Sequence, residues 1–168
     1  LTRPEIGPEA IRVDLMRGLA HAAGARGMVW GQALDIAAET APDPLGLDEI
    51  IRLQGNKTGA LIEFAATAGA VIARADPAPL HRYAAAIGLA FQIADDILDV
   101  TGDETRAGKR VGKDDAAGKA TFVSLMGLDG ARTEAARLID EAEAALSQYD
   151  GRAGNLRQLA RFVIQRDS

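Results

Sequence analysis

The sequence contains no cysteine, and aromatic residues make up only 4% of its 168 positions. The absence of cysteine excludes disulfides and thiolate metal sites. No apolar run approaches the roughly 18 residues that a membrane-spanning helix needs, so we expect no such helix. Basic residues are outnumbered, with 19 lysines and arginines against 24 aspartates and glutamates. The resulting net charge of −5 argues against nucleic acid as the main partner.

The amino-acid composition predicts one all-α domain over residues 1–168. Hydrophobic residues reach 48%, and they are mainly alanine, leucine and isoleucine, which suit close-packed helices. The length is sufficient for one domain with its own core, and no strand-like alternation or internal repeat interrupts it. The first residues carry neither an initiator methionine nor a signal-peptide pattern, so we expect a longer protein of which this chain is a part.

An acidic stripe stands out on the helix that we expect over about residues 80–100. At about 100° per residue, Gln92, Asp95, Asp96 and Asp99 fall within one narrow arc of an otherwise apolar helix. Like charges one turn apart repel, and partial burial adds to the cost. Mg²⁺ would relieve both, because it prefers oxygen ligands and usually binds one or two carboxylates plus substrate phosphates. The alternative is an exposed acidic face that binds nothing.

Two cationic segments accompany the stripe. Lys57 and Thr58 stand between two glycines, a pattern that indicates a kink exposing a cation and a hydroxyl. Lys109 and Lys119 belong to a basic, glycine-containing segment over residues 102–119, directly after the stripe. Taken alone, each segment could be a solvated surface. Together they predict a site in which carboxylates hold a metal, the metal holds a phosphate, and lysines bind the phosphate from the other side.

Four motifs in this order resemble the trans-isoprenyl diphosphate synthase family, and within it the bacterial farnesyl diphosphate synthases. Residues 88–99 resemble the second aspartate-rich motif of that family. Residues 27–35 resemble its Gly-Gln-x-x-Asp segment, which includes Asp35, although the residue pattern alone leaves open whether Asp35 is merely solvated. The Lys-Thr segment and the two downstream lysine positions are matched by residues 57–62, 108–110 and 118–121.

The resemblance implies an isoprenoid-synthase-type helical bundle around a central cavity. It also implies a Mg²⁺-dependent prenyltransferase that condenses an allylic diphosphate, dimethylallyl or geranyl diphosphate, with isopentenyl diphosphate. The two substrates join head to tail, pyrophosphate leaves, and the expected product is farnesyl diphosphate. Such enzymes are expected to be cytoplasmic homodimers.

The resemblance also assigns roles to residues of this chain. Asp95 would bind Mg²⁺ directly, and Asp96 and Asp99 would support it directly or through water. The allylic diphosphate would be held by Lys57, Lys109 and Lys119. Thr58 and Gln92 would face the reacting allyl group, beside Phe91 as a further substrate-binding residue.

One required motif is missing. The family carries a first aspartate-rich motif on a facing helix, and no second cluster of this kind occurs here. Asp114 and Asp115 lack a third carboxylate, and Asp43 and Asp48 lie around a turn. We therefore expect residues 1–168 to be the C-terminal part of a single all-α prenyltransferase domain. The first motif, the isopentenyl diphosphate site and the N-terminal helices are expected to lie upstream. The 168 residues alone are predicted to be inactive.

Three alternatives remain beside the main interpretation. A geranyl or geranylgeranyl diphosphate synthase would share every motif found here. A non-catalytic subunit of a heteromeric prenyl synthase is disfavoured by the intact second motif. A terpene cyclase would carry an Asn-Ser/Thr-Glu type metal motif, and the sequence has none.

Overall fold

The structure is a computed structural model, and it describes residues 1–101 and 120–165. These residues form helices joined by turns, and no strand occurs among them. The all-α prediction is therefore confirmed. In chain order the elements are η1 (Pro4–Ile6), α1 (Glu9–Ala23), α2 (Met28–Ala38), α3 (Leu47–Gln54), η2 (Gly55–Gly59), α4 (Ala60–Ala73), α5 (Ala78–Thr101), α8 (Phe122–Ala145), η3 (Ser147–Ala153) and α9 (Gly154–Gln165).

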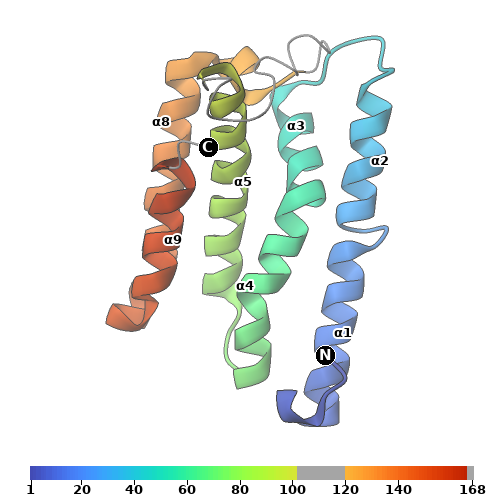
Figure 1. The fold of residues 1–168 in the computed structure, drawn as a ribbon, viewed down its shortest axis with the longest axis vertical. Helices are drawn as coiled ribbons and strands as arrows, with labels where there is room; N and C mark the ends of the chain where they lie inside the picture. Colours follow the sequence, from blue (N-terminus) through green and yellow to red (C-terminus); the bar gives the residue numbers. More distant parts are fainter. Residues whose placement is uncertain (102–119, 166–168) are drawn as a thin grey trace.

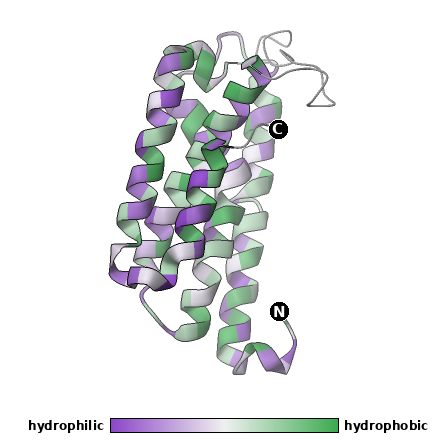
Figure 2. Cartoon of the chain, turned by 60° about the vertical axis from the view of Figure 1, so that its left-hand side comes forward, coloured by the Kyte–Doolittle hydropathy of each residue, from purple (hydrophilic) through white to green (hydrophobic). Residues whose placement is uncertain are grey.

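The helices stand side by side in roughly parallel columns (Figure 1). α1 continues into α2 along one side of the molecule, and α3, η2 and α4 form the next column. α5 follows, with α8 and α9 on its other side, and the most extensive contact between any two elements joins α5 to α8. The helices alternate apolar and polar residues along their length (Figure 2), as expected when each helix presents one face to its neighbours.

α5 is the central helix of the core. Its apolar residues recur at helical spacing, and Tyr83, Ala90 and Ile93 are almost completely buried. Alanines of α8 face it, with Ala131 and Ala142 fully buried, so the two helices approach closely. The predicted helix over about residues 80–100 is thus confirmed, and it continues without a break through the acidic stripe.

Tyr83 joins the core to the last helix. Its side chain is only 1% exposed, and its hydroxyl donates a hydrogen bond to the carbonyl oxygen of Leu156 at 2.8 Å. Burial raises the pKa of Tyr83 to about 12, because the phenolate would lose its hydration. No helix within residues 1–101 and 120–165 combines the length and the apolar composition that a membrane-spanning segment requires.

Candidate functional site

The acidic stripe lies along the last turns of α5. Asp95 is exposed, whereas Gln92, Asp96 and Asp99 are partly buried. On the other sides of the same helix, Ile93 is 1% exposed and contributes to the core. α5 therefore buries its apolar faces and leaves its carboxylates along one accessible edge, as the helical spacing predicts.

Asp96 differs from its neighbours because it also fixes the start of α8. One of its carboxylate oxygens accepts the backbone N–H of Phe122, the first residue of α8, at 2.7 Å. Thr121 and Ser124 cap the same helix through reciprocal side-chain to backbone bonds of 3.1 and 2.9 Å. A carboxylate at a helix N-terminus is stabilised by the unpaired N–H groups and the positive end of the helix dipole.

The Lys57-Thr58 segment forms a π-helical turn, η2, between α3 and α4. The predicted interruption is therefore present, but as a widened helical turn in place of a sharp kink. Such turns are frequent at functional sites. Lys57 donates to Asp35 of α2, with 2.7 Å between the ammonium nitrogen and a carboxylate oxygen. The Lys57 and Asp35 side chains are 33% and 16% exposed, so Asp35 is not merely solvated.

Two glycines bring η2 against its neighbouring helices. A Cβ added to Gly31 of α2 would lie 2.2 Å from the backbone nitrogen of Lys57, so only glycine permits this approach. A Cβ on Gly88 of α5 would lie 3.5 Å from the Cα of Gly59, which is ordinary van der Waals contact. Because Gly88 lies one helical turn before Gln92, the lysine-bearing turn is placed beside the helix that carries the acidic stripe.

The remaining predicted site residues fall into two groups. Phe91 is partly buried and packs against the core. Lys109 and Lys119 lie outside the described residues. The structure therefore brings together Asp35, the η2 turn and α5, and the two downstream lysines remain predictions.

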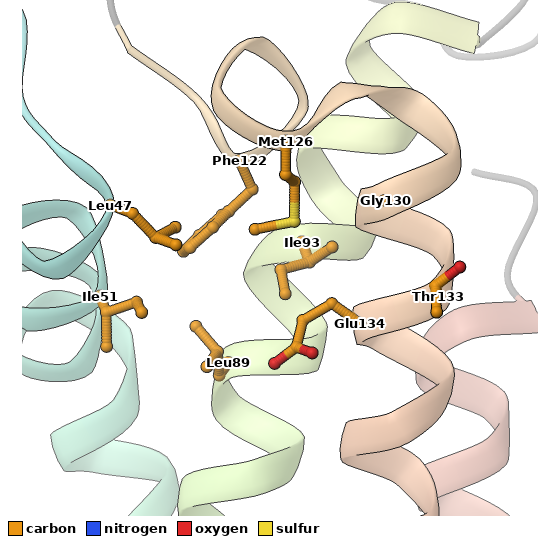
Figure 3. Close-up of a pocket in the computed structure, with 9 residues that line it drawn as sticks. All are labelled: Leu47, Ile51, Leu89, Ile93, Phe122, Met126, Gly130, Thr133 and Glu134. Atoms are coloured by element: carbon orange, nitrogen blue, oxygen red, sulfur yellow. The ribbon is translucent and has the colours of Figure 1, made fainter.

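An apolar pocket of about 450 Å³ lies between α3, α5 and α8 (Figure 3). Its lining residues are Leu47, Ile51, Leu89, Ile93, Phe122, Met126, Gly130, Thr133 and Glu134. None of them is a predicted site residue, although Leu89 and Ile93 lie three residues before Gln92 and Asp96, respectively, and so adjoin the acidic stripe of α5. The Glu134 carboxylate accepts two hydrogen bonds from Arg137, which hold the pKa of that carboxyl below its usual range. The pocket therefore adjoins the acidic stripe without including any of the predicted diphosphate-binding residues.

The carboxylates of α5 need additional oxygen ligands to bind a hard divalent cation. Among residues 1–101 and 120–165, no cluster of three or more histidine, aspartate or glutamate side chains could hold a metal ion by itself. Asp95 and Asp99, one turn apart, could supply two oxygen ligands. Mg²⁺ commonly takes one or two carboxylates and completes its shell with water and substrate phosphates, so this donor set suits it.

A family model described as Polyprenyl synthetase matches residues 9–156. The chain belongs to the polyprenyl synthetase family. The predicted family resemblance is thereby confirmed, and the match extends from α1 to α9 through every described part of the candidate site.

Comparisons with individual proteins give the same result. The chain is 44% identical to the farnesyl diphosphate synthase of Escherichia coli (strain K12), over 98% of this chain and 56% of that protein. It is also similar to the structure of an FPP/GFPP synthase from Zymomonas mobilis, with a TM-score of 0.85, 44% identity, and coverage of 96% and 54%. A geranyltransferase from Helicobacter pylori, complexed with magnesium and isoprenyl diphosphate, gives a TM-score of 0.76 at 31% identity, over 95% of this chain and 52% of that one. The chain thus spans about half the length of the relatives it matches.

Proposed function

We propose that the protein containing this chain is a Mg²⁺-dependent short-chain prenyltransferase. It joins an allylic diphosphate to isopentenyl diphosphate head to tail, releases pyrophosphate, and makes farnesyl diphosphate. The observation that supports the proposal is the packing of the Lys57-Thr58 turn against α5, where Gly59 approaches Gly88 one helical turn before the acidic stripe begins at Gln92. Cations and carboxylates side by side suit a metal–diphosphate group better than either would alone.

In this proposal the chain binds the leaving diphosphate from two sides. Asp95 and Asp99 hold Mg²⁺ with the support of Asp96, while Lys57, Lys109 and Lys119 bind phosphate oxygens directly. Bound Mg²⁺ neutralises charge that develops on the leaving pyrophosphate. Lysines aimed at the same oxygens add electrostatic stabilisation in a site that needs no reorganisation.

The polar groups next to the lysine act on the allyl group. When the bond between the allylic carbon and the diphosphate oxygen breaks, its electron pair leaves with pyrophosphate and an allylic cation remains. Oxygen dipoles of Thr58 and Gln92 stabilise this cation, and Phe91 contributes to the substrate-binding surface. The terminal alkene carbon of isopentenyl diphosphate then bonds to the cation, and pyrophosphate takes the proton that the condensed product loses. An apolar, closed surrounding protects the cation from water.

The product length is assigned from sequence similarity. Geranyl and geranylgeranyl diphosphate synthases would use the same groups, and the sequence similarity to a farnesyl diphosphate synthase favours the C15 product. We further propose that the active form is a cytoplasmic homodimer and that the 168 residues alone do not turn over, since a facing aspartate-rich motif is absent from them.

An assay of product formation by the full-length protein tests the proposal. The protein is incubated with radiolabelled isopentenyl diphosphate and either dimethylallyl or geranyl diphosphate, with Mg²⁺ or with EDTA, and the products are separated by chain length. We expect farnesyl diphosphate only with Mg²⁺. Undiminished turnover in EDTA, or no condensation with either allylic substrate, would reject the proposal. A C10 or C20 product would reject only the assigned chain length.

A further inference from the structure

Lys57 is held by two residues of α2 that lie one helical turn apart. Gly31 receives the backbone of Lys57, because its missing Cβ leaves the space that the Lys57 nitrogen approaches. Asp35 binds the ammonium of the same lysine at 2.7 Å. One face of α2 therefore fixes both the base and the tip of a single side chain.

The Asp35–Lys57 pair is more protected from solvent than the other ion pairs between described residues. Its side chains are 16% and 33% exposed, compared with 25% and 57% for Glu143 and Arg161. Hydrogen bonds between ionised groups are the stronger kind, and partial burial reduces their screening. A flexible lysine side chain is thereby restricted to few orientations.

We propose that Asp35 is a positioning residue that acts through Lys57. This inference rests on the proposed function. An ammonium has three N–H donors, and a single carboxylate oxygen at 2.7 Å occupies one of them. Within residues 1–101 and 120–165 no other group accepts from this ammonium, so two donors remain for the phosphate oxygens of the allylic substrate. Asp35 fixes the Lys57 ammonium before the substrate arrives, so the ordering of this side chain is not a cost of binding.

A double-mutant cycle in the full-length protein tests whether Asp35 acts through Lys57. Asp35→Ala, Lys57→Ala and the double variant are compared by KM and kcat for geranyl diphosphate at saturating isopentenyl diphosphate. We expect Asp35→Ala to raise the KM for geranyl diphosphate by roughly tenfold, the effect of losing one hydrogen bond to a charged group. The KM for isopentenyl diphosphate should not change. In the Lys57→Ala background, Asp35→Ala should add nothing.

Additive effects of the two substitutions would overturn the inference, because Asp35 would then act independently of Lys57. Equal increases in the KM values of both substrates would do the same. If circular dichroism shows that Asp35→Ala does not fold, the cycle is repeated with Asp35→Asn, which keeps the shape and removes the charge. A wild-type protein without any condensation activity rejects the proposed function itself, whereas an active wild type with an additive cycle rejects only the role of Asp35.

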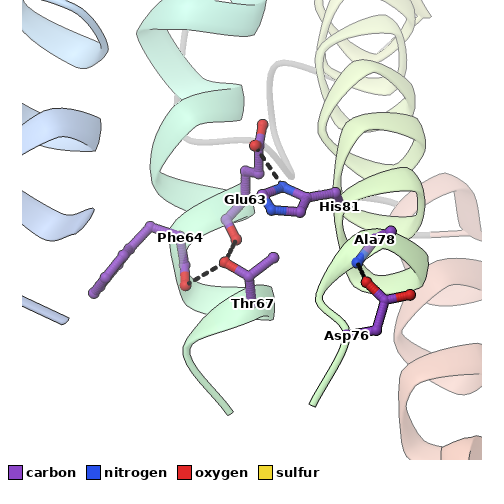
Figure 4. A network of polar contacts seen from close by, with 6 residues as sticks. All are labelled: Glu63, Phe64, Thr67, Asp76, Ala78 and His81. Carbon is purple, nitrogen blue, oxygen red and sulfur yellow. Dashed lines mark hydrogen bonds and ion pairs between the residues drawn. The ribbon is translucent and has the colours of Figure 1, made fainter. Parts of the chain in front are cut away.

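A hydrogen-bonded pair between two other helices provides a matched control. Glu63 of α4 and His81 of α5 are 2.6 Å apart and about half exposed (Figure 4). Glu63 lies on the same continuous helical column as Lys57, but its pair joins α4 to α5 and involves no predicted site residue. Glu63→Gln should leave both KM values unchanged. An increase comparable to that of Asp35→Ala would show that any lost polar contact between helices perturbs the site, and the specific role of Asp35 would be wrong.

Discussion

The carboxylate of Asp96 accepts the backbone N–H of Phe122 at 2.7 Å, across 26 residues of chain. This bond joins the acidic stripe of α5 to the first turn of α8. It lies beside the Thr121 cap, so the side chains of Asp96 and Thr121 satisfy two of the free N–H groups at this helix end. A residue predicted to support a metal is therefore also part of the fold. The neighbouring carboxylates of the stripe can be distinguished from it by experiment.

Asp96→Ala should lower the free energy of unfolding by about 1 kcal/mol, the usual effect of removing a side chain that caps a helix N-terminus. Urea unfolding followed by circular dichroism measures the change. Asp129→Ala is the control, since Asp129 is 99% exposed and pairs only with Arg132 of its own helix at 3.8 Å. An Asp96 variant as stable as the control would show that the contact with Phe122 contributes nothing.

Asp95→Asn should act on catalysis and leave stability nearly unchanged. Asp95 is exposed, and substitutions at such positions usually alter stability by less than about 0.5 kcal/mol. The loss of a direct Mg²⁺ ligand should reduce kcat in the full-length protein by roughly a hundredfold or more, because metal stabilisation of the leaving group contributes several kcal/mol. Steady-state assays at saturating substrate measure the change. Turnover close to that of the wild type would remove Asp95 from the proposed metal site.

Local periodicity was sufficient to predict the helix of the acidic stripe, because residues at spacings of three and four define its faces without reference to the rest of the chain. The interruption at Lys57 was also predictable from its flanking glycines. The contact partners of these residues could not be predicted from the sequence. Asp35 and Lys57 are separated by 22 residues, and Asp96 and Phe122 by 26, so both contacts depend on how the helices pack.

Gly31 was the available signal for one of those contacts. A glycine within a helix costs about 1 kcal/mol relative to alanine, so its presence indicates a close approach by another part of the chain. Sequence alone does not say which part approaches. The structure identifies it as the backbone of Lys57, at a distance where no Cβ would fit.

Gly31→Ala should therefore destabilise the fold and disturb the site together. The added Cβ would lie 2.2 Å from the Lys57 nitrogen and 2.4 Å from its Cα, so η2 must shift away from α2. Overpacking of this kind usually costs about 1–3 kcal/mol, and the displaced lysine should raise the KM for the allylic diphosphate. Gly69→Ala is the control: Gly69 is in α4 with no atom within 4 Å of an added Cβ, and there alanine should stabilise by about 0.4–1 kcal/mol. Equal effects of the two substitutions on urea unfolding would contradict the close approach.

Tyr83 makes the free energy of unfolding depend on pH in the alkaline range. Its pKa is raised by burial to about 12, whereas an unfolded tyrosine has a pKa near 10. The folded state therefore holds the phenolic proton more tightly, and this contribution is complete below about pH 10 and is lost as the pH rises toward 12. Tyr83→Phe has no such proton, so between pH 8 and pH 11 it should lose less unfolding free energy than the wild type, by about 1 kcal/mol. Urea titrations at both values measure this difference. All other side chains are the same in both proteins, so equal losses would show that Tyr83 keeps an ordinary pKa.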